Sequence, residues 1–430
     1  MATEHETPSV RLSTRQAAFI GVGSMVGAGI FSLLGAAGEV AGAAVWVSFL
    51  IAGGIAALQG YSFAKMGARY PSAGGLLEYV VRGWGNGHFT GVIGWLVLAV
   101  NAIITGMVAV SFGSYASAAT DAGTAGVKVF AVLLIVAMAG LNVVGSQAVA
   151  RAQTVVVVVV IGILTLFAIT TLFNIEQGHL SPAVYPSFSD IVASVALTFF
   201  AFLGFGVITF TAKDLADPAR QLPRAVFLAL GIATVIYVAV ALGVFGVLTV
   251  EEVISSGGTA LAVAAEPVLG SVGFGLMTVT ALFATAGATN SGLYPAAGLC
   301  EQLARIGQFP PGLGARLGGR APMGLVVTAV IAILLAAGFD LNAIASIGSA
   351  VALVVFALVS VGHLRVRAET GAKAWVLGLG IATNLVVLTT FVLTTLVEEP
   401  STAAALVVIL ALSIGADLVW KRRSPVASRG

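Results

Sequence analysis

Charged residues are scarce in this chain of 430 residues, because Asp, Glu, Lys and Arg together make up only 9% of it. A soluble domain carries roughly 25%. Apolar residues make up 59%, and a single hydrophobic core cannot bury that much surface, because cores stop growing near about 250 to 300 residues. The composition therefore excludes a soluble globular protein and predicts one that crosses the bilayer several times.

Cysteine is nearly absent as well. The single Cys300 excludes an internal disulfide. The four histidines lie far apart and show no metal-ligand spacing. The net charge of +2 gives no reason to expect nucleic acid as a partner. We therefore expect no cofactor and no metal, and because no catalytic constellation is found, we expect no enzyme.

Long apolar runs are what the chain has in abundance. Runs of about 20 residues, enough to span a bilayer, recur along it. The six valines at 155–160 lie inside one of them, where lipid permits only a helix or a closed barrel. We predict an all-α membrane protein with twelve transmembrane helices. Their approximate residues are 16–37, 41–66, 89–118, 124–144, 152–174, 190–212, 222–249, 269–300, 323–338, 342–363, 374–396 and 401–420.

The basic residues give this topology an orientation. With twelve spans, every lysine and arginine except Lys128 falls on the side of the N-terminus, which the positive-inside rule assigns to the cytoplasm. The first fifteen residues lack the apolar core of a cleavable signal peptide. We expect a multi-pass protein of the cytoplasmic (plasma) membrane with both termini cytoplasmic.

The first span is unusually rich in glycine, since residues 21–31 read GVGSMVGAGIF. Backbone that is not helical is tolerated at membrane depth only where it is buried in protein or lines a polar cavity. If the chain unwinds at Gly27, Ala28 and Gly29, its free amides can bind an anion and its free carbonyls a cation. A zwitterion satisfies both. The alternative is that Gly23 and Gly27 form a GxxxG packing face.

A second interruption follows about 180 residues later. Residues 199–211 read FFAFLGFGVITFT, again with paired glycines inside a span. Transporters built from inverted repeats place a discontinuous helix in each repeat and bind substrate between the two. The predicted division is a cytoplasmic tail at 1–15, a first five-helix repeat at 16–174, an inverted second repeat at 190–364, two additional helices at 371–420 and a basic cytoplasmic tail at 421–430.

Four motifs in this order resemble the amino acid/polyamine/organocation (APC) superfamily of permeases. They are GVGSMVGAGIF, KMGARYPSAGG at 65–75, FFAFLGFGVITFTAKDLADPARQLPRAVF at 199–227 and LARIGQFP at 303–310. The resemblance runs from about residue 12 to 365 and is nearest to archaeal proton-coupled amino acid permeases of broad specificity. It implies the LeuT-like fold of five plus five helices, with helices 1 and 6 discontinuous.

The resemblance also implies where the substrate binds. In the family, backbone amides of the first helix hold the substrate carboxylate, carbonyls of the sixth helix hold the amino group, and an aromatic ring covers the ligand. The matching positions on the first helix are Ser24, Met25, Gly27, Ala28 and Gly29. On the sixth helix they are Phe200, which supplies the ring, Leu203 and Gly204. Contacts that are mostly to backbone imply broad, apolar specificity.

The sequence departs from the family pattern at two positions tied to ion coupling. Many members carry an acidic residue where this chain has Gly206, and several proton-coupled members carry a lysine where it has Val160. The eighth span offers polar side chains as ligands for an ion or water: Thr285, Thr289, Asn290 and Ser291. The alternative is that the hydroxyls only bond the preceding helical turn.

Together these features predict a secondary active transporter, a permease that moves neutral amino acids by alternating access and proton symport. Its partners would be a small amino acid, the lipid bilayer and protons, while its oligomeric state stays open. An uncoupled facilitator or exchanger is the alternative. A transporter of cationic amino acids or polyamines is less favoured, because no carboxylate lies near the two interruptions.

Overall fold

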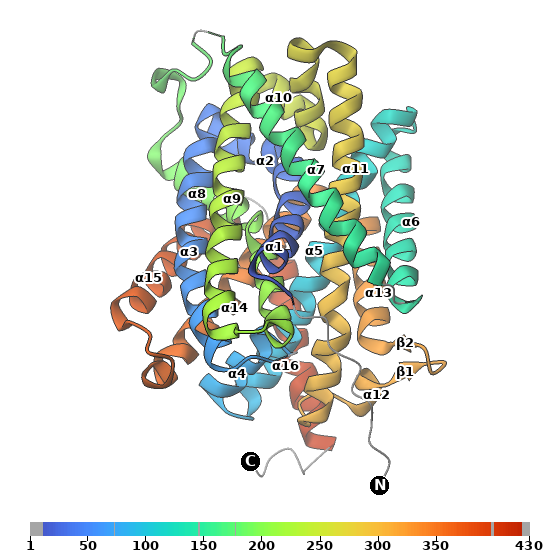
Figure 1. Cartoon of the computed structure of the whole chain (residues 1–430), viewed down its shortest axis with the longest axis vertical. Coiled ribbons are helices and arrows are strands. Elements are labelled where there is room, and N and C mark those ends of the chain that lie inside the picture. The colour runs from blue at the N-terminus through green and yellow to red at the C-terminus, as the bar shows by residue number, and fades with distance from the viewer. Residues whose placement is uncertain (1–11, 73, 145–146, 177, 397–399, 424–430) are drawn as a thin grey trace.

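The computed structural model describes residues 12–72, 74–144, 147–176, 178–396 and 400–423, and these residues are almost entirely helical (Figure 1). The predicted tails therefore lie largely outside the described residues. The first part of the chain contains α1 (Thr14–Ala28), α2 (Ile30–Ala41), η1 (Gly42–Ala44), α3 (Val45–Arg69), α4 (Leu76–Trp84), α5 (His88–Thr120), α6 (Gly123–Val144) and α7 (Gln147–Leu172).

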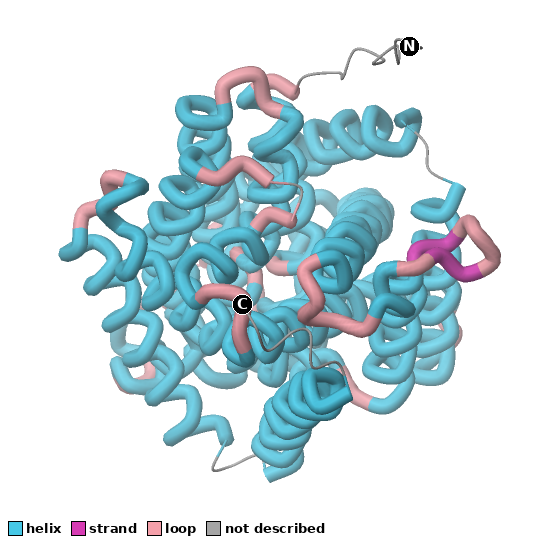
Figure 2. Tube along the Cα trace, turned by 90° about the horizontal axis from the view of Figure 1, so that it is seen from below, coloured by secondary structure: helices cyan, strands magenta, loops and turns pink. Residues whose placement is uncertain are grey.

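The middle of the chain contains η2 (Pro182–Val184), α8 (Phe188–Phe200), η3 (Leu203–Asp214), α9 (Pro218–Val247), α10 (Val250–Ser256), η4 (Gly257–Thr259) and α11 (Ala260–Arg305). The remainder contains α12 (Pro311–Gly314), β1 (Arg316–Leu317), β2 (Ala321–Pro322), α13 (Met323–Gly338), α14 (Leu341–Thr370), α15 (Ala374–Phe391), η5 (Val392–Leu396) and α16 (Pro400–Arg423). The antiparallel hairpin β1–β2 lies at the edge of the bundle (Figure 2).

The helices begin where the sequence supplies caps. Ser13 accepts a hydrogen bond from the Gln16 amide while the Gln16 side chain accepts one from Ser13, which is a capping box. Asp340 caps α14 through the Ala343 amide. The six valines lie inside α7, because a backbone in lipid has to satisfy its own hydrogen bonds.

The prediction of an all-α, multi-pass membrane protein is confirmed. Ten helical stretches among the described residues are long and apolar enough to cross a membrane, and the apolar Met323–Gly338 is shorter. Some of these stretches join neighbouring elements, as Ile30–Arg69 joins α2 to α3. The count of twelve spans stays a prediction.

The helices differ in how much protein surrounds them. In the apolar window of Phe188–Asp214, 83% of residues are buried, and in that of Leu341–Thr370 the share is 78%. The share is only 17% for Gly123–Val144 and Thr402–Arg423. The stretch containing α8 and η3 therefore lies inside the bundle with α14, while α6 and α16 are the least buried of these ten stretches of the described residues.

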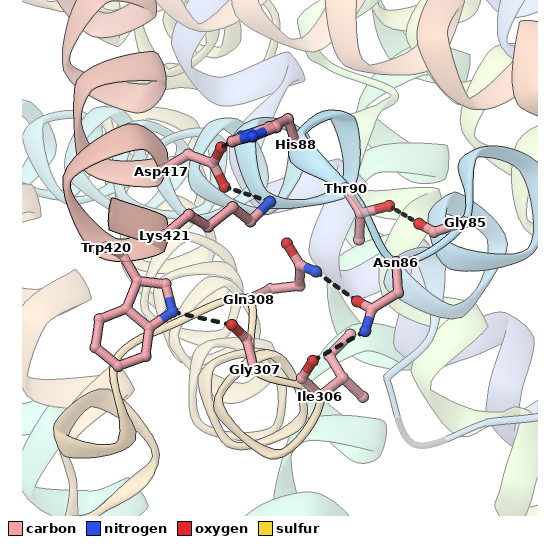
Figure 3. A network of polar contacts seen from close by, with 10 residues as sticks. All are labelled: Gly85, Asn86, His88, Thr90, Ile306, Gly307, Gln308, Asp417, Trp420 and Lys421. Atoms are coloured by element: carbon pink, nitrogen blue, oxygen red, sulfur yellow. Dashed lines mark hydrogen bonds and ion pairs between the residues drawn. The ribbon is translucent and has the colours of Figure 1, made fainter. Parts of the chain in front are cut away.

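Hydrogen bonds and ion pairs connect the exposed helix α16 to the rest of the bundle (Figure 3). The Asp417 carboxylate contacts the Lys421 ammonium at 2.9 Å and the His88 ring of α5 at 2.6 Å. The indole of Trp420 donates to the Gly307 carbonyl at 2.9 Å. The segment that follows α11 is thus where α5, α11 and α16 meet, which gives the LARIGQFP motif a structural role.

The connection between α9 and α11 is a pair of short helical elements followed by a kink. α10 and η4 precede α11, which contains a break at Gly270 with φ of 66°. η4 packs closely on α2, since a Cβ on Gly35 would lie 2.9 Å from the Gly257 Cα. The segment therefore covers the end of the first predicted span.

Candidate functional site

The predicted unwinding at Gly27, Ala28 and Gly29 stays a prediction, because only Gly29 lies outside the two helices of this span. α1 ends at Ala28, α2 begins at Ile30, and Gly29 between them has φ of −99° and ψ of −74°. The Gly29 amide still donates to the Met25 carbonyl at 2.9 Å, and the Leu33 amide donates to the Gly29 carbonyl at 3.1 Å. Helical hydrogen bonding thus continues on both sides of Gly29. The side chain of Ala28 lies outside the described part of the chain.

The second interruption is longer. α8 ends at Phe200, and the 12 residues Leu203–Asp214 form a 3-10 helix. The 3-10 geometry extends the chain to about 2.0 Å per residue, and runs longer than three or four residues are uncommon and often mark a functional hinge. The backbone here is therefore drawn out over the second part of the predicted sixth helix, from residue 203 onward.

The two interruptions touch each other. A Cβ on Gly204 would lie 2.6 Å from both the Met25 nitrogen and the Ser24 carbonyl carbon. A Cβ on Gly29 would lie 2.4 Å from that of Ala201. Real Cβ atoms do not approach backbone so closely, so glycine at these positions lets the two segments come together. Residues that sequence analysis assigned to one substrate site do lie side by side.

A small cavity lies where the segments meet, and we name it the central cavity. Its volume is about 50 Å³, and because one water needs roughly 10 to 15 Å³ of such space, it has room for a few waters. Ser24 and Asn101 supply its polar side chains. The walls are Ser24, Leu76, Val97, Val100, Asn101, Ile104, Leu203, Gly204, Gly206, Val207, Phe210, Gly292, Val355 and Phe356.

Other predicted site residues are packed rather than open to this cavity. Met25 and Phe200 are fully buried. The Phe200 ring lies against α14, where a Cβ on Gly348 would come within 2.4 Å of it. A Cβ on Gly27 would lie 2.2 Å from the Ala284 carbonyl oxygen of α11. The region is thus closed, with its predicted binding groups in contact with protein.

One side of the central cavity is closed by the start of α4. Leu76 and Phe210 both line it. Gly75 has φ of +50°, and a Cβ there would lie 2.7 Å from the Thr209 hydroxyl and 2.9 Å from the Phe210 ring. Glycine is therefore required at this turn for conformation and for space, which accounts for the end of the KMGARYPSAGG motif.

The predicted coupling positions lie in different surroundings. Val160 is 4% exposed and lines a second, smaller cavity of about 10 Å³, which we name the hollow. The hollow is lined by Gly23, Val26, Gly27, Gln153, Val156, Val157, Val160, Ile161, Phe283, Ala284 and Gly287. Gly206, by contrast, faces open space, since a Cβ there would meet no atom within 4 Å.

The hydroxyls of the eighth span are bonded within their own helix. Thr285 donates to the Ala281 carbonyl at 2.6 Å, and Thr289 donates to the Thr285 carbonyl at 2.9 Å. Both side chains are fully buried. This arrangement matches the alternative left open by the sequence, and ion ligation by either residue stays a prediction.

Sequence analysis missed an amide cluster that joins three helices. Asn142 of α6, Gln153 of α7 and Asn290 of α11 are hydrogen-bonded to one another. They line a third cavity of about 330 Å³, named the wide cavity, whose walls are Leu12, Phe19, Ile20, Leu141, Asn142, Gln153, Thr154, Val157, Val207, Thr211, Asp214, Asn290, Ser291 and Tyr294. The sequence feature that could have revealed the cluster is the presence of Asn and Gln inside apolar spans, because their carboxamides form hydrogen bonds with neighbouring helices.

Comparison with known proteins settles the family. The family model described as amino acid permease matches residues 12–416. The chain belongs to the amino acid permease family. The inner membrane transport protein YbaT of Escherichia coli is 31% identical over 429 residues, which cover 99% of this permease and 100% of YbaT. The branched-chain amino acid permease BcaP of Lactococcus lactis is 26% identical, over 84% of this permease and 82% of BcaP.

A solved structure supports the fold. A mutant of the manganese transporter of Eremococcus coleocola superposes with a TM-score of 0.62 at 15% identity, covering 100% of this permease and 96% of that chain. At this identity the likeness shows the fold alone, a LeuT-like transporter fold. The resemblance to APC permeases is confirmed by the family match, and membership implies a membrane protein with a small amino acid substrate.

Proposed function

We propose that this permease is a secondary transporter that moves neutral amino acids across the cytoplasmic membrane by alternating access. The substrate carboxylate binds at Ser24, Met25 and the segment 27–29, and its amino group binds at Phe200, Leu203 and Gly204. The observation that carries the proposal is the contact of these two segments at Gly204, beside the central cavity. Opening that contact would expose peptide groups of both segments to one ligand.

The walls of the central cavity support a neutral substrate. The residues that line it are apolar or carry an uncharged polar group. A guanidinium or ammonium side chain would require a carboxylate partner when removed from water. Apolar walls such as Val97, Val355 and Phe356 instead suit aliphatic side chains. The name of the relative BcaP, a branched-chain amino acid permease, agrees with this choice.

Proton symport is part of the proposal through the family resemblance. A second candidate, uncoupled facilitation or exchange, is favoured by one observation: Val160 and Gly206 place no titratable group at either predicted coupling position. The cytoplasmic location of both termini is likewise proposed, on the distribution of basic residues.

The substrate is tested by counterflow in proteoliposomes, because preloaded unlabelled substrate drives uptake whether or not an ion is coupled. We expect saturable uptake of labelled alanine and leucine, and none of glutamate or arginine above protein-free liposomes. Saturable uptake of arginine alone would overturn the neutral-substrate proposal.

Coupling is tested in the same vesicles without preloading. An inward proton gradient, a sodium gradient or no gradient is imposed, and internal leucine is followed to its plateau. Proton symport predicts accumulation above the external concentration only under the proton gradient. A plateau at equilibrium under all three conditions would establish the uncoupled alternative.

A further inference from the structure

Two side chains, those of Gln153 and Val157, line both the wide cavity and the hollow, and Gln153 is the polar one of the two. The hollow lies against Gly23 and Gly27 of the first predicted span. The wide cavity is lined by Leu12, whose amide donates to the Asp214 carbonyl at 2.8 Å. A path from the start of the described chain to the first-span glycines therefore passes Val157 and Gln153, and only Gln153 can be held there by side-chain hydrogen bonds.

Hydrogen bonds hold Gln153 in this position. Its Nε2 donates to the Ser291 hydroxyl at 2.6 Å and to the Gly287 carbonyl at 3.2 Å, and its Oε1 accepts from the Asn290 Nδ2 at 3.2 Å. The Asn290 Oδ1 in turn accepts from the Asn142 Nδ2 at 2.7 Å. Gln153 thus uses both of its protons and its oxygen to bind α7 to α11.

Backbone carbonyls fix which end of each amide is the donor. The Gly287 carbonyl can only accept, so the Gln153 atom beside it is the nitrogen. The Met138 carbonyl, which accepts from the Asn142 Nδ2 at 2.8 Å, fixes the other end of the chain of amides in the same way. The network therefore has one consistent direction, from Asn142 through Asn290 and Gln153 to Ser291.

The two residues that follow Gln153 on its side of α7 are apolar. Val157 and Val160 follow Gln153 at i+4 and i+7, on the same side of the helix. Both valines line the hollow and pack without hydrogen bonds to side chains. Apolar contacts allow helices to slide or part in small steps, whereas the hydrogen bonds of Gln153 are either made or broken.

We propose that Gln153 is the inner latch of this permease, a positioning residue that holds α7 on α11 and closes the passage from the wide cavity to the hollow. The proposal rests on the proposed alternating access, in which one side of the substrate site opens at a time. Opening of the passage from the wide cavity to the hollow, which Gly27 of the proposed carboxylate site lines, requires the bonds of Gln153 to Ser291 and Asn290 to break. Because amides do not titrate at ordinary pH, the latch strength is independent of pH.

The test measures access to the hollow and needs no substrate. The only native cysteine is Cys300, so Cys300→Ala gives a cysteine-free background into which Val160→Cys is introduced. Labelling of this cysteine by a charged methanethiosulfonate reagent is timed in vesicles with the reagent on the side of the wide cavity. We expect Gln153→Met, similar in length but unable to form these bonds, to speed labelling roughly threefold to tenfold, as loss of interhelical hydrogen bonds in a membrane predicts.

Two further variants are compared with Gln153→Met, one with a smaller expected effect and one that serves as a control. Ser291→Ala removes one of the partners, so labelling should accelerate less, by roughly twofold. Thr211→Val is the matched control, because Thr211 lines the wide cavity but bonds only the Ile208 carbonyl one turn earlier in its own segment, at 2.7 Å. Its labelling rate should match that of the parent. The acceleration in Gln153→Met should also be equal at about pH 6 and about pH 8, since a carboxamide does not titrate.

An unchanged rate in a folded Gln153→Met protein, or an equal acceleration in Thr211→Val, would overturn the latch. If Gln153→Met does not fold, an unchanged rate in Ser291→Ala overturns it instead. Failure of the proposed function is seen separately, as absence of alanine and leucine counterflow in the unmodified protein.

Discussion

The two interruptions of the bundle use glycine in different ways. At Gly29 the backbone departs from α-helix at one residue, and glycine mainly lets neighbouring backbone approach. After Phe200 the chain is a 3-10 helix for 12 residues. There Gly204 makes a close contact, whereas Gly206 faces open space. A pair of glycines in a span thus indicates an irregular helix. It does not reveal which glycine allows close contact between helices and which one borders open space.

The largest effect is expected where a glycine meets backbone. In Gly27→Val the new Cβ would lie 2.2 Å from the Ala284 carbonyl oxygen, which cannot move unless α11 moves. Overpacking of this kind costs about 3 kcal/mol, and that corresponds to roughly 100-fold in binding. Counterflow of leucine should therefore fall by about 100-fold, with the protein still recovered from the membrane fraction.

Gly54→Val is the matched control for this variant. Gly54 lies in α3, and a Cβ there would meet nothing within 4 Å. Its counterflow should equal that of the parent protein. Retained transport in Gly27→Val would mean that α1 and α11 separate freely, and the first interruption would then be a simple packing face.

A smaller effect is expected at the contact between the two interruptions. In Gly204→Ala the added methyl group would lie 2.6 Å from the Met25 nitrogen, so η3 must shift away from α1. We expect counterflow to fall about tenfold, since a small displacement costs less than a branched side chain. Ligand-dependent stabilisation by leucine, read as the shift in Tm, should shrink in parallel. A Tm shift equal to that of the parent would show that the contact is unrelated to substrate.

Gly206→Ala is the direct comparison for Gly204→Ala, because it adds the same methyl group two residues later in η3. No atom lies within 4 Å of the new Cβ, so we expect counterflow and Tm to stay within about twofold and about 1 °C of the parent. Equal damage at Gly204 and Gly206 would mean that backbone flexibility of η3, rather than close contact, is what the glycines supply.

Hydropathy and length alone locate long apolar helices, and ten such stretches lie among the described residues, while the count of twelve spans stays a prediction. The expected span at 124–144 appears as α6 (Gly123–Val144), and the glycine motifs pointed to segments that do meet in space. The length of η3 was not predictable, because α-helix and 3-10 helix share the same apolar residues. The amide cluster was also missed, since Gln153 and Asn290 are 137 residues apart and only the packing of α7 on α11 joins them.

The smallest effect is expected in the eighth span, at Thr289→Val. Its hydroxyl proton is already donated to the Thr285 carbonyl, and a bond of this kind within a helix contributes little stability. An ion would need the hydroxyl oxygen to face space, yet the side chain is fully buried and is absent from the walls of the central cavity, the hollow and the wide cavity. We therefore expect counterflow within about twofold of the parent and an unchanged response to a proton or sodium gradient. Loss of gradient-driven accumulation with counterflow intact would instead identify Thr289 as an ion ligand, because only the coupling step would then have failed.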